Sequence, residues 1–294
     1  MKATLYLIIA TSLWGLNYHF ARLVLSEVDF LEGGFWRYAL AVLTLLLVNI
    51  KKLPSLATLK ENFKGIFYIG AIGLFGFNFF FFKGMQSTTG VNGALIMGLN
   101  PAITLLLSSL ILKTTIKSKH YIGLTISLLG VLYLLLKGDF GGVTELSFQG
   151  GDVLVLISVI FFALHHVWVK KYSSDKVNNQ QFTLMSALFC FSCFTVIMPF
   201  IPLSDFTDHS ATFWVGAIGI GCLGTGLAYL FWNRGVKLAG AHNAGIFVNL
   251  VPLSAGISAS LFGETLFYYH FISGGVIIFG LIIMQTKILD LKWR

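Results

Sequence analysis

Residues 161–171, FFALHHVWVKK, place two adjacent histidines in an apolar run that ends in two lysines. Imidazole is the side chain whose ordinary pKa lets it gain or lose a proton near neutral pH. His165, and in the first apolar run His19, are therefore candidates for proton coupling. Because successive residues on a helix point about 100° apart, we expect only His165 to face a polar cavity. His166 is expected to pack against or bond to a neighbouring helix. The alternative is that both form ordinary hydrogen bonds between helices.

The first apolar run repeats this pairing of a polar side chain with an aromatic one. The segment WGLNYHFAR aligns with FALHHVWVK and places Asn17 opposite His165. Trp168 follows His165 by three residues, and Trp14 precedes Asn17 by three, so each tryptophan shares a helix face with its polar neighbour. We expect these four side chains to line one central cavity.

The composition indicates an integral membrane protein. The 294-residue chain is 56% hydrophobic and only 11% charged, and its mean hydropathy is +0.82. Soluble domains carry about a quarter charged residues. A membrane-spanning helix needs about 20 mainly apolar residues. The sequence predicts an all-α protein with ten such spans, at about 4–22, 33–50, 64–82, 91–112, 120–136, 151–169, 181–201, 212–233, 242–262 and 267–285.

The distribution of charge predicts the orientation of these spans. Cytoplasmic loops are enriched in lysine and arginine. If the N-terminus is cytoplasmic, most basic residues fall on the cytoplasmic side and most acidic residues on the other. The basic exceptions are Arg22, Arg37, Lys83 and Lys137. Both termini are therefore expected in the cytoplasm. Arg37, at the outer start of the second span, is expected to pair with an outer acid such as Glu32 or to extend to the lipid headgroups.

The chain contains an internal repeat. KGMQSTTGVNGALIMGLNP, residues 83–101, aligns without gaps on RGVKLAGAHNAGIFVNLVP, residues 234–252. This predicts two copies of a five-helix unit, residues 1–138 and 148–288. Because five is odd, the second copy enters the membrane inverted. Inverted repeats are the architecture of secondary transporters, in which the two halves exchange conformations and open a site to either side.

Each predicted repeat carries a proline near the middle of its fourth span, Pro101 in the first and Pro252 in the second. Proline cannot donate a backbone hydrogen bond, so each is expected to break its helix and free carbonyl groups near the midplane. The adjacent Asn100 and Asn249 would make this region a polar part of the cavity. Packing kinks without a ligand are the alternative reading.

Two glycine-rich segments, GAIGLFGFN and GAIGIGCLGTG, are expected to let helices pack closely rather than to bind a ligand. Asn78 ends the first segment, and Tyr229 follows the second. Both side chains complete the predicted lining of the central cavity.

The ordered set of motifs in both halves resembles the EamA family of the drug/metabolite transporter superfamily. These motifs are WG in the first span, WRYALA opening the second, the two mid-span prolines, and LFGE followed by HFISGGVIIFG near the end. The resemblance covers almost the whole chain and implies a ten-helix inner-membrane carrier that exports small metabolites, often amino acids, through a central cavity. Leu-His-His in the sixth span departs from the plainer residues of many members, so substrate and coupling do not carry over.

The sequence thus predicts a secondary transporter that works by alternating access. Amino acids and related neutral, zwitterionic or heterocyclic compounds are the expected substrates, and export is the expected direction. The alternatives are an intramembrane enzyme and a channel. An enzyme would need paired aspartates or a His-Glu metal motif, and LHHVW lacks the glutamate. Few basic residues are expected inside, which counts against phosphorylated sugars.

The expected partners are the small-molecule metabolite and the lipid bilayer. No metal or cofactor is expected. No nucleic-acid partner is expected either, because the net charge of +8 is spread over short gaps between apolar runs. The expected location is a bacterial inner membrane, and the sequence leaves open whether the chain is a monomer or a homodimer.

Overall fold

The computed structural model describes residues 2–88, 93, 96–141, 149–173, 177–201, 208–261 and 266–285. These residues form helices joined by turns and contain no strand, which confirms the predicted all-α class. The predicted boundaries at 148 and 288 lie outside the described residues.

The helices of the N-terminal half begin almost at the first residue. They are α1 (Lys2–Leu25), α2 (Phe30–Val48), α3 (Leu56–Phe67), the π-helical segment η1 (Tyr68–Leu74), α4 (Phe75–Met85), α6 (Asn100–Leu112) and α7 (Ser118–Leu135). Segments α3, η1 and α4 follow one another without a break.

The C-terminal half has a similar order of elements. They are α8 (Gly150–Tyr172), α9 (Asn179–Ile197), η3 (Met198–Phe200), α10 (Ala211–Ile218), the π-helical η5 (Gly219–Leu227), α11 (Ala228–Ala239), α12 (Ala241–Gly245), η6 (Ile246–Asn249), α13 (Leu250–Leu261) and α14 (Tyr268–Gln285).

Within the described part of the chain, six helical segments are long and apolar enough to cross a membrane, as the composition predicts for an integral membrane protein. They are Phe30–Val48, Leu56–Met85, Ser118–Leu135, Gly150–Tyr172, Asn179–Phe200 and Ala211–Ala239. Segments Asn100–Leu112 and Tyr268–Met284 are shorter apolar helices. The count of ten spans stays a prediction.

The third predicted span is longer than its apolar run. It was placed at 64–82, but the helix begins at Leu56, where the Ser55 hydroxyl accepts a hydrogen bond from the amide of Thr58 and caps the helix. Hydropathy marks only the lipid-facing part of a helix, whereas a serine cap fixes where the helix starts.

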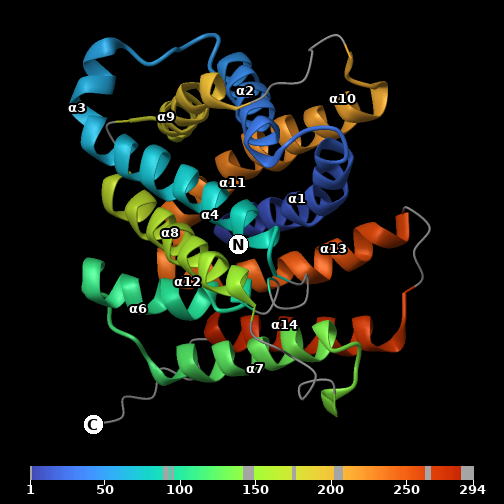
Figure 1. The fold of residues 1–294 in the computed structure, drawn as a ribbon. Coiled ribbons are helices and arrows are strands. Elements are labelled where there is room, and N and C mark those ends of the chain that lie inside the picture. The colour runs from blue at the N-terminus through green and yellow to red at the C-terminus, as the bar shows by residue number, and fades with distance from the viewer. Residues whose placement is uncertain are drawn as a thin grey trace.

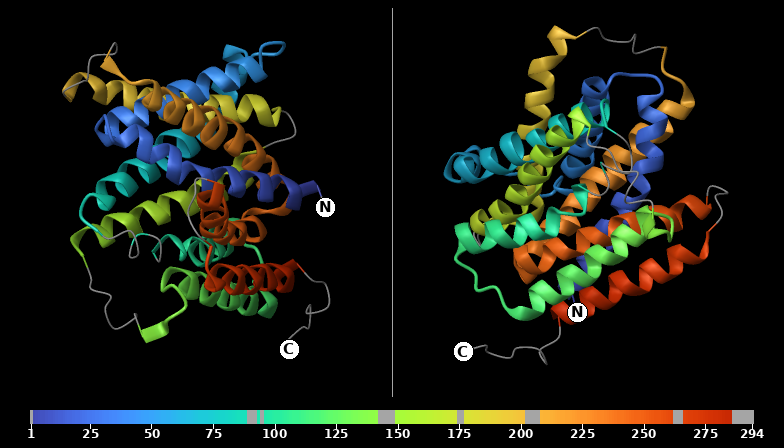
Figure 2. Two further views of the ribbon diagram at one scale, coloured as in Figure 1. Left: turned by 90° about the vertical axis from the view of Figure 1, so that its right-hand side faces the viewer. Right: turned by 60° about the horizontal axis from the view of Figure 1, so that its bottom comes forward.

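Helices distant in sequence lie side by side throughout the bundle. α7 and α14 run together along one edge, as all views show (Figures 1 and 2). At their contact, a Cβ added to Gly123 would lie 2.6 Å from the carbonyl oxygen of Gly280, so only glycine permits this approach. Elsewhere α1 packs on α11 and α13, α8 packs on α4 and α6, and α2 packs on α9. Small residues at such contacts let backbones approach where lipid gives no hydrophobic driving force.

The glycine-rich segments form the two π-helical stretches. η1 packs on α8 and α9, and η5 packs on α1 and α2. A Cβ on Gly70 would lie 2.3 Å from the carbonyl oxygen of Ser186, and one on Gly221 would lie 2.6 Å from Leu40 Cβ. The predicted close packing at these glycines is confirmed.

We expect Gly70→Ala to destabilise the protein, because the new methyl group would overlap the α9 backbone. Overpacking of this kind costs about 1–3 kcal/mol. The measurement is thermal unfolding of the detergent-purified protein. The control is Gly275→Ala on α14, where a Cβ would meet no atom within 4 Å. That control should unfold at or above the wild-type temperature, since alanine favours helix. Equal unfolding temperatures for Gly70→Ala and the wild type would contradict the close contact.

Candidate functional site

A cavity of about 120 Å³ lies between helices from both halves of the chain. One water needs roughly 10–15 Å³ of such space, so this cavity has room for part or all of a small metabolite. The polar lining comes from Asn17, Arg37 and Tyr229. The aromatic lining comes from Trp14, Phe77, Phe81, Phe82 and Phe162, and the aliphatic lining from Ala21, Met97, Ile220, Val248 and Val251.

Beside the cavity lies an aromatic cluster, by which we mean Trp14, Phe162, Tyr229 and Trp232; the first three line the cavity and Trp232 packs behind them. The Trp14 ring centroid lies 5.5 Å from that of Phe162, 5.4 Å from that of Tyr229 and 4.8 Å from that of Trp232. Phe162 also stacks on Phe77 at 4.4 Å. The cluster joins α1, α8 and α11, and Phe77 extends it to α4, so it couples helices of both halves.

Arg37 is the charged side chain among the described residues that line the cavity. It is 7% exposed. Its Nε donates to the Thr225 hydroxyl at 2.6 Å, and its Nη1 donates to the Asn78 side-chain oxygen at 3.0 Å. Asn78 in turn donates to the Tyr38 hydroxyl at 3.0 Å. These bonds tie α2 to α4 and η5.

The expectation that Arg37 pairs with Glu32 or extends to the headgroups is wrong. Glu32 lies five residues earlier on α2, on a different helix face, since residues three or four apart share a face. Arg37 therefore turns toward η5, where Thr225 lies. Its depth of about two turns inside α2 was the signal that could have located it in the interior.

Asn17 joins the two halves through a backbone contact. Its side-chain amide donates to the carbonyl oxygen of Gly224 at 3.1 Å. A Cβ on Gly224 would overlap the Asn17 side chain, so this glycine makes room for the asparagine. Of the residues predicted for the central cavity, Trp14, Asn17 and Tyr229 lie together in its lining.

The two histidines lie behind the aromatic cluster. His165 and His166 are fully buried, and neither lines the cavity. The His165 ring lies 5.4 Å from that of Tyr229, and the His166 ring lies 4.3 Å from that of Phe162. His166 Nδ1 lies 3.4 Å from the Thr104 hydroxyl. Among the described residues, neither nitrogen of His165 has a partner within hydrogen-bonding geometry.

The remaining predicted side chains lie away from the cavity lining. Asn100 donates to the carbonyl oxygen of Val159 at 3.4 Å, and Asn249 donates to the Ser127 hydroxyl at 2.8 Å. Trp168 packs on Tyr68, with ring centroids 5.1 Å apart. His19 is partly buried on α1. Asn78 meets the cavity only through Arg37.

Both prolines stand just inside the start of a helix. α6 begins at Asn100, so Pro101 lies in its first turn. α13 begins at Leu250, after the 3-10 segment η6, so Pro252 lies in its first turn as well. Proline fits the first turn, where a backbone N–H would have no helical acceptor.

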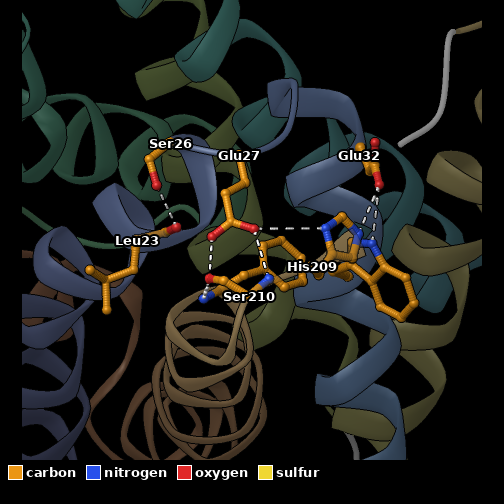
Figure 3. Close-up of polar contacts among 8 residues, drawn as sticks. Leu23, Ser26, Glu27, Glu32, His209 and Ser210 are labelled. Carbon is orange, nitrogen blue, oxygen red and sulfur yellow. Dashed lines mark hydrogen bonds and ion pairs between the residues drawn. The ribbon is translucent and has the colours of Figure 1, made fainter. Parts of the chain in front are cut away.

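A second polar cluster joins the α1–α2 turn to the start of α10 (Figure 3). His209 lies 4.0 Å from a Glu27 carboxylate oxygen and 3.5 Å from one of Glu32. Trp36 donates to the same Glu32 oxygen at 3.4 Å. Glu27 accepts hydrogen bonds from the hydroxyl and the amide of Ser210, and these bonds lower the pKa of the Glu27 carboxyl.

Comparison with known proteins gives matches along nearly the whole chain. The model of the EamA-like transporter family matches residues 1–136 and 149–286. The uncharacterized transporter YyaM of Bacillus subtilis is 30% identical over 274 residues, which are 91% of this chain and 88% of that protein. The uncharacterized transporter YetK of the same organism is 27% identical over 98% of this chain and 88% of its own length.

A solved crystal structure shares the fold. It covers 96% of both chains with a TM-score of 0.82, at 17% sequence identity.

We expect the contact between Glu27 and Ser210 to weaken at low pH. The carboxyl has a lowered pKa when folded, so its contribution is present above the ordinary value of 4.5 and is lost as pH falls through the lowered pKa. Glu27→Gln should therefore lower the unfolding temperature at pH 7, and the difference from wild type should shrink below pH 4.5. Glu61→Gln, at an exposed position on α3, is the control. A difference that stays constant with pH would contradict this role.

Proposed function

We propose that this chain, which belongs to the EamA-like transporter family and is a membrane transporter, moves small metabolites by alternating access. The observation that carries the proposal is the central cavity. Its lining comes from α1, α2, α4 and the segment before α6 in the first matched region, and from α8, η5, α11, η6 and α13 in the second. A cavity between two halves is where a carrier with internal repeats binds its substrate.

Two observations support ten spans arranged as inverted five-helix repeats. The offset that aligns residue 83 with 234 also aligns the start of η1 with the start of η5. The contacts between halves are reciprocal as well. α1 packs on α11 and α13, whereas α8, its counterpart, packs on α4 and α6. Such exchange of partners follows from a two-fold relation between the halves, residues 1–138 and 148–288.

The charge distribution supports cytoplasmic termini in a bacterial inner membrane. With that topology, Ala21 and Phe82 of the cavity lining belong to the outer ends of α1 and α4. Near the inner ends of α8 and α11, the Lys170 ammonium donates to the carbonyl oxygen of Lys237 at 2.8 Å. We take this conformation as open toward the outer side and closed toward the inner side.

This conformation indicates which residues would contact the substrate. Trp14, Asn17 and Tyr229 would touch the substrate directly, because they line the cavity. His165 packs on Tyr229, so it would be exposed if the rings of the aromatic cluster moved apart. This position supports a role for His165 on the inner part of the path. New helices begin at Asn100 and just after Asn249. These breaks would let the fourth and ninth spans bend at Pro101 and Pro252. Asn78 and Trp168 stay proposed members of the central binding region, Asn78 through its hydrogen bond to Arg37, and His19 stays a candidate for proton coupling.

Aromatic and amide groups in the lining favour export of amino acids or related zwitterionic and heterocyclic compounds. The relatives are named transporters, which counts against the intramembrane enzyme. A carrier and a channel differ in whether they exchange substrate across the membrane. After a carrier releases one substrate molecule, it can bind a second on that side and carry it back, whereas a channel does not couple the two movements.

We expect counterflow in proteoliposomes that hold the purified protein. Vesicles preloaded with unlabelled amino acids, nucleobases or aromatic amines, one at a time, should take up the labelled compound in a transient overshoot for at least one of them. Ala21→Trp should abolish the overshoot, because it fills the cavity. Leu110→Trp, on an exposed face of α6, should retain it. Leak without overshoot would favour a channel, and no movement of any compound would refute the proposal.

We expect His165→Ala to slow counterflow and to flatten its dependence on pH between about 5 and 8, because the proposed opposite conformation exposes this imidazole to water, where histidine titrates in that range. The matched control is His270→Ala on α14, which lies outside the cavity lining. If both the rate and the pH profile of His165→Ala equal those of the wild type, the path does not use this histidine.

A further inference from the structure

We propose that Arg37 is the anchor for a substrate carboxylate, so that the cavity selects compounds with one negative group and an apolar, preferably aromatic, body. This inference rests on the proposed function, because it names the substrate class of the same cavity. It narrows the expected substrates, which are amino acids and related neutral, zwitterionic or heterocyclic compounds, to those that carry a carboxylate.

The charge of Arg37 has no counter-ion in the described part of the chain. Its hydrogen-bond partners, Thr225 and Asn78, are neutral. The nearest acid on its own helix, Glu32, is turned toward His209 and Trp36. A guanidinium within a membrane span is expensive unless it faces a cavity or meets an anion. Arg37 faces the cavity, and a bound anion would complete its pairing.

The two neutral partners also orient the guanidinium. Thr225 holds Nε and Asn78 holds Nη1, which fixes the plane of the group from two sides. The guanidinium has more N–H groups than these bonds use, and none of the bonds involves Nη2. A planar group held in this way presents its free edge to a carboxylate, which matches it with two parallel hydrogen bonds.

The remaining lining defines the rest of the ligand. Phe77, Phe162, Trp14 and Tyr229 give the cavity flat aromatic walls beside Arg37. Aromatic side chains pair with aromatic ligands in stacked or edge-to-face arrangements. One guanidinium can neutralise one carboxylate, so the cavity disfavours dianions. It also disfavours amines without a carboxylate, because a second positive charge would lie beside Arg37 without compensation.

The competing explanation is that Arg37 only links α2, α4 and η5. If Arg37 had only a structural role, the affinity of a ligand would not depend on the sign of its charge. The two explanations therefore differ in a measurement on the unmodified protein.

The experiment compares three probes that carry the same phenyl ring. They are L-phenylalanine, 3-phenylpropanoate, which lacks the amine, and 2-phenylethylamine, which lacks the carboxylate. Dissociation constants come from thermal unfolding of the wild-type protein over a concentration series, because a ligand that binds only the folded state raises its stability. We expect both carboxylates to bind at least roughly tenfold more tightly than the amine, the usual effect of a charge-assisted hydrogen bond.

Variants test the residue. Arg37→Gln should weaken both carboxylates at least roughly tenfold and leave the amine unchanged or slightly tighter. Arg37→Lys keeps the charge but loses the planar fork, so it should bind carboxylates with intermediate affinity. Arg22→Gln, which removes a charge from an exposed position on α1, should match the wild type. If Arg37→Gln fails to fold, the affinities of Arg37→Lys and of the wild type for the three probes still distinguish a carboxylate anchor from a purely structural arginine.

Three results would overturn the inference: no binding of either carboxylate, binding of the amine as tight as that of the carboxylates, or unchanged carboxylate affinity in Arg37→Gln. Counterflow separates this failure from failure of the proposed function. Overshoot for neutral or cationic compounds alone would keep the transporter and remove the role of Arg37. Selective binding of carboxylates without counterflow of any compound would keep the role of Arg37 and remove the alternating-access carrier.

Discussion

The hydrogen bonds of Arg37 are the interaction on which the central region depends. They join α2 to α4 and, across the middle of the chain, to η5. A guanidinium surrounded by neutral groups inside a bundle costs solvation free energy that those groups offset only in part. The helices must therefore remain close enough to supply both partners, and the space on the remaining side must accept polar or ionic contents. A cavity beside Arg37 follows from this requirement.

Close approach of backbones makes that arrangement possible. Gly224 leaves room for Asn17 beside η5, and Gly70 leaves room for α9 beside η1. Both segments are π-helical, and such widened turns are often found at functional sites. In η5 the Thr225 hydroxyl donates to the carbonyl oxygen of Ile220 at 2.7 Å, so the same side chain satisfies its own helix and accepts from Arg37. The glycines thus serve packing and indirectly position the polar groups of the cavity.

Hydropathy was sufficient to predict the helical class and the positions of several helices. The span predicted at 151–169 lies within α8, and the one predicted at 267–285 nearly coincides with α14. Periodicity could not predict which face of a helix meets which neighbour. The prediction that Arg37 pairs with an outer acid such as Glu32 or extends to the headgroups is wrong for this reason, because loop charge counts ignore helix rotation. The sequence also gives no signal for π-helical geometry, since glycine-rich runs occur in ordinary membrane helices too.

The same limit explains the placement of the candidate site residues. Trp14, Asn17 and Tyr229 lie together in the cavity lining, whereas His165 is fully buried outside that lining and packs against Tyr229. Under the two-fold relation that we propose between the halves, a single conformation opens only one of the two equivalent faces. Asn17 and His165 are counterparts in the aligned segments, so on this proposal an open face at Asn17 implies a closed one at His165. The burial of His165 is then what the proposed alternating access requires of this conformation, and in the opposite conformation the burial of Asn17 would replace it.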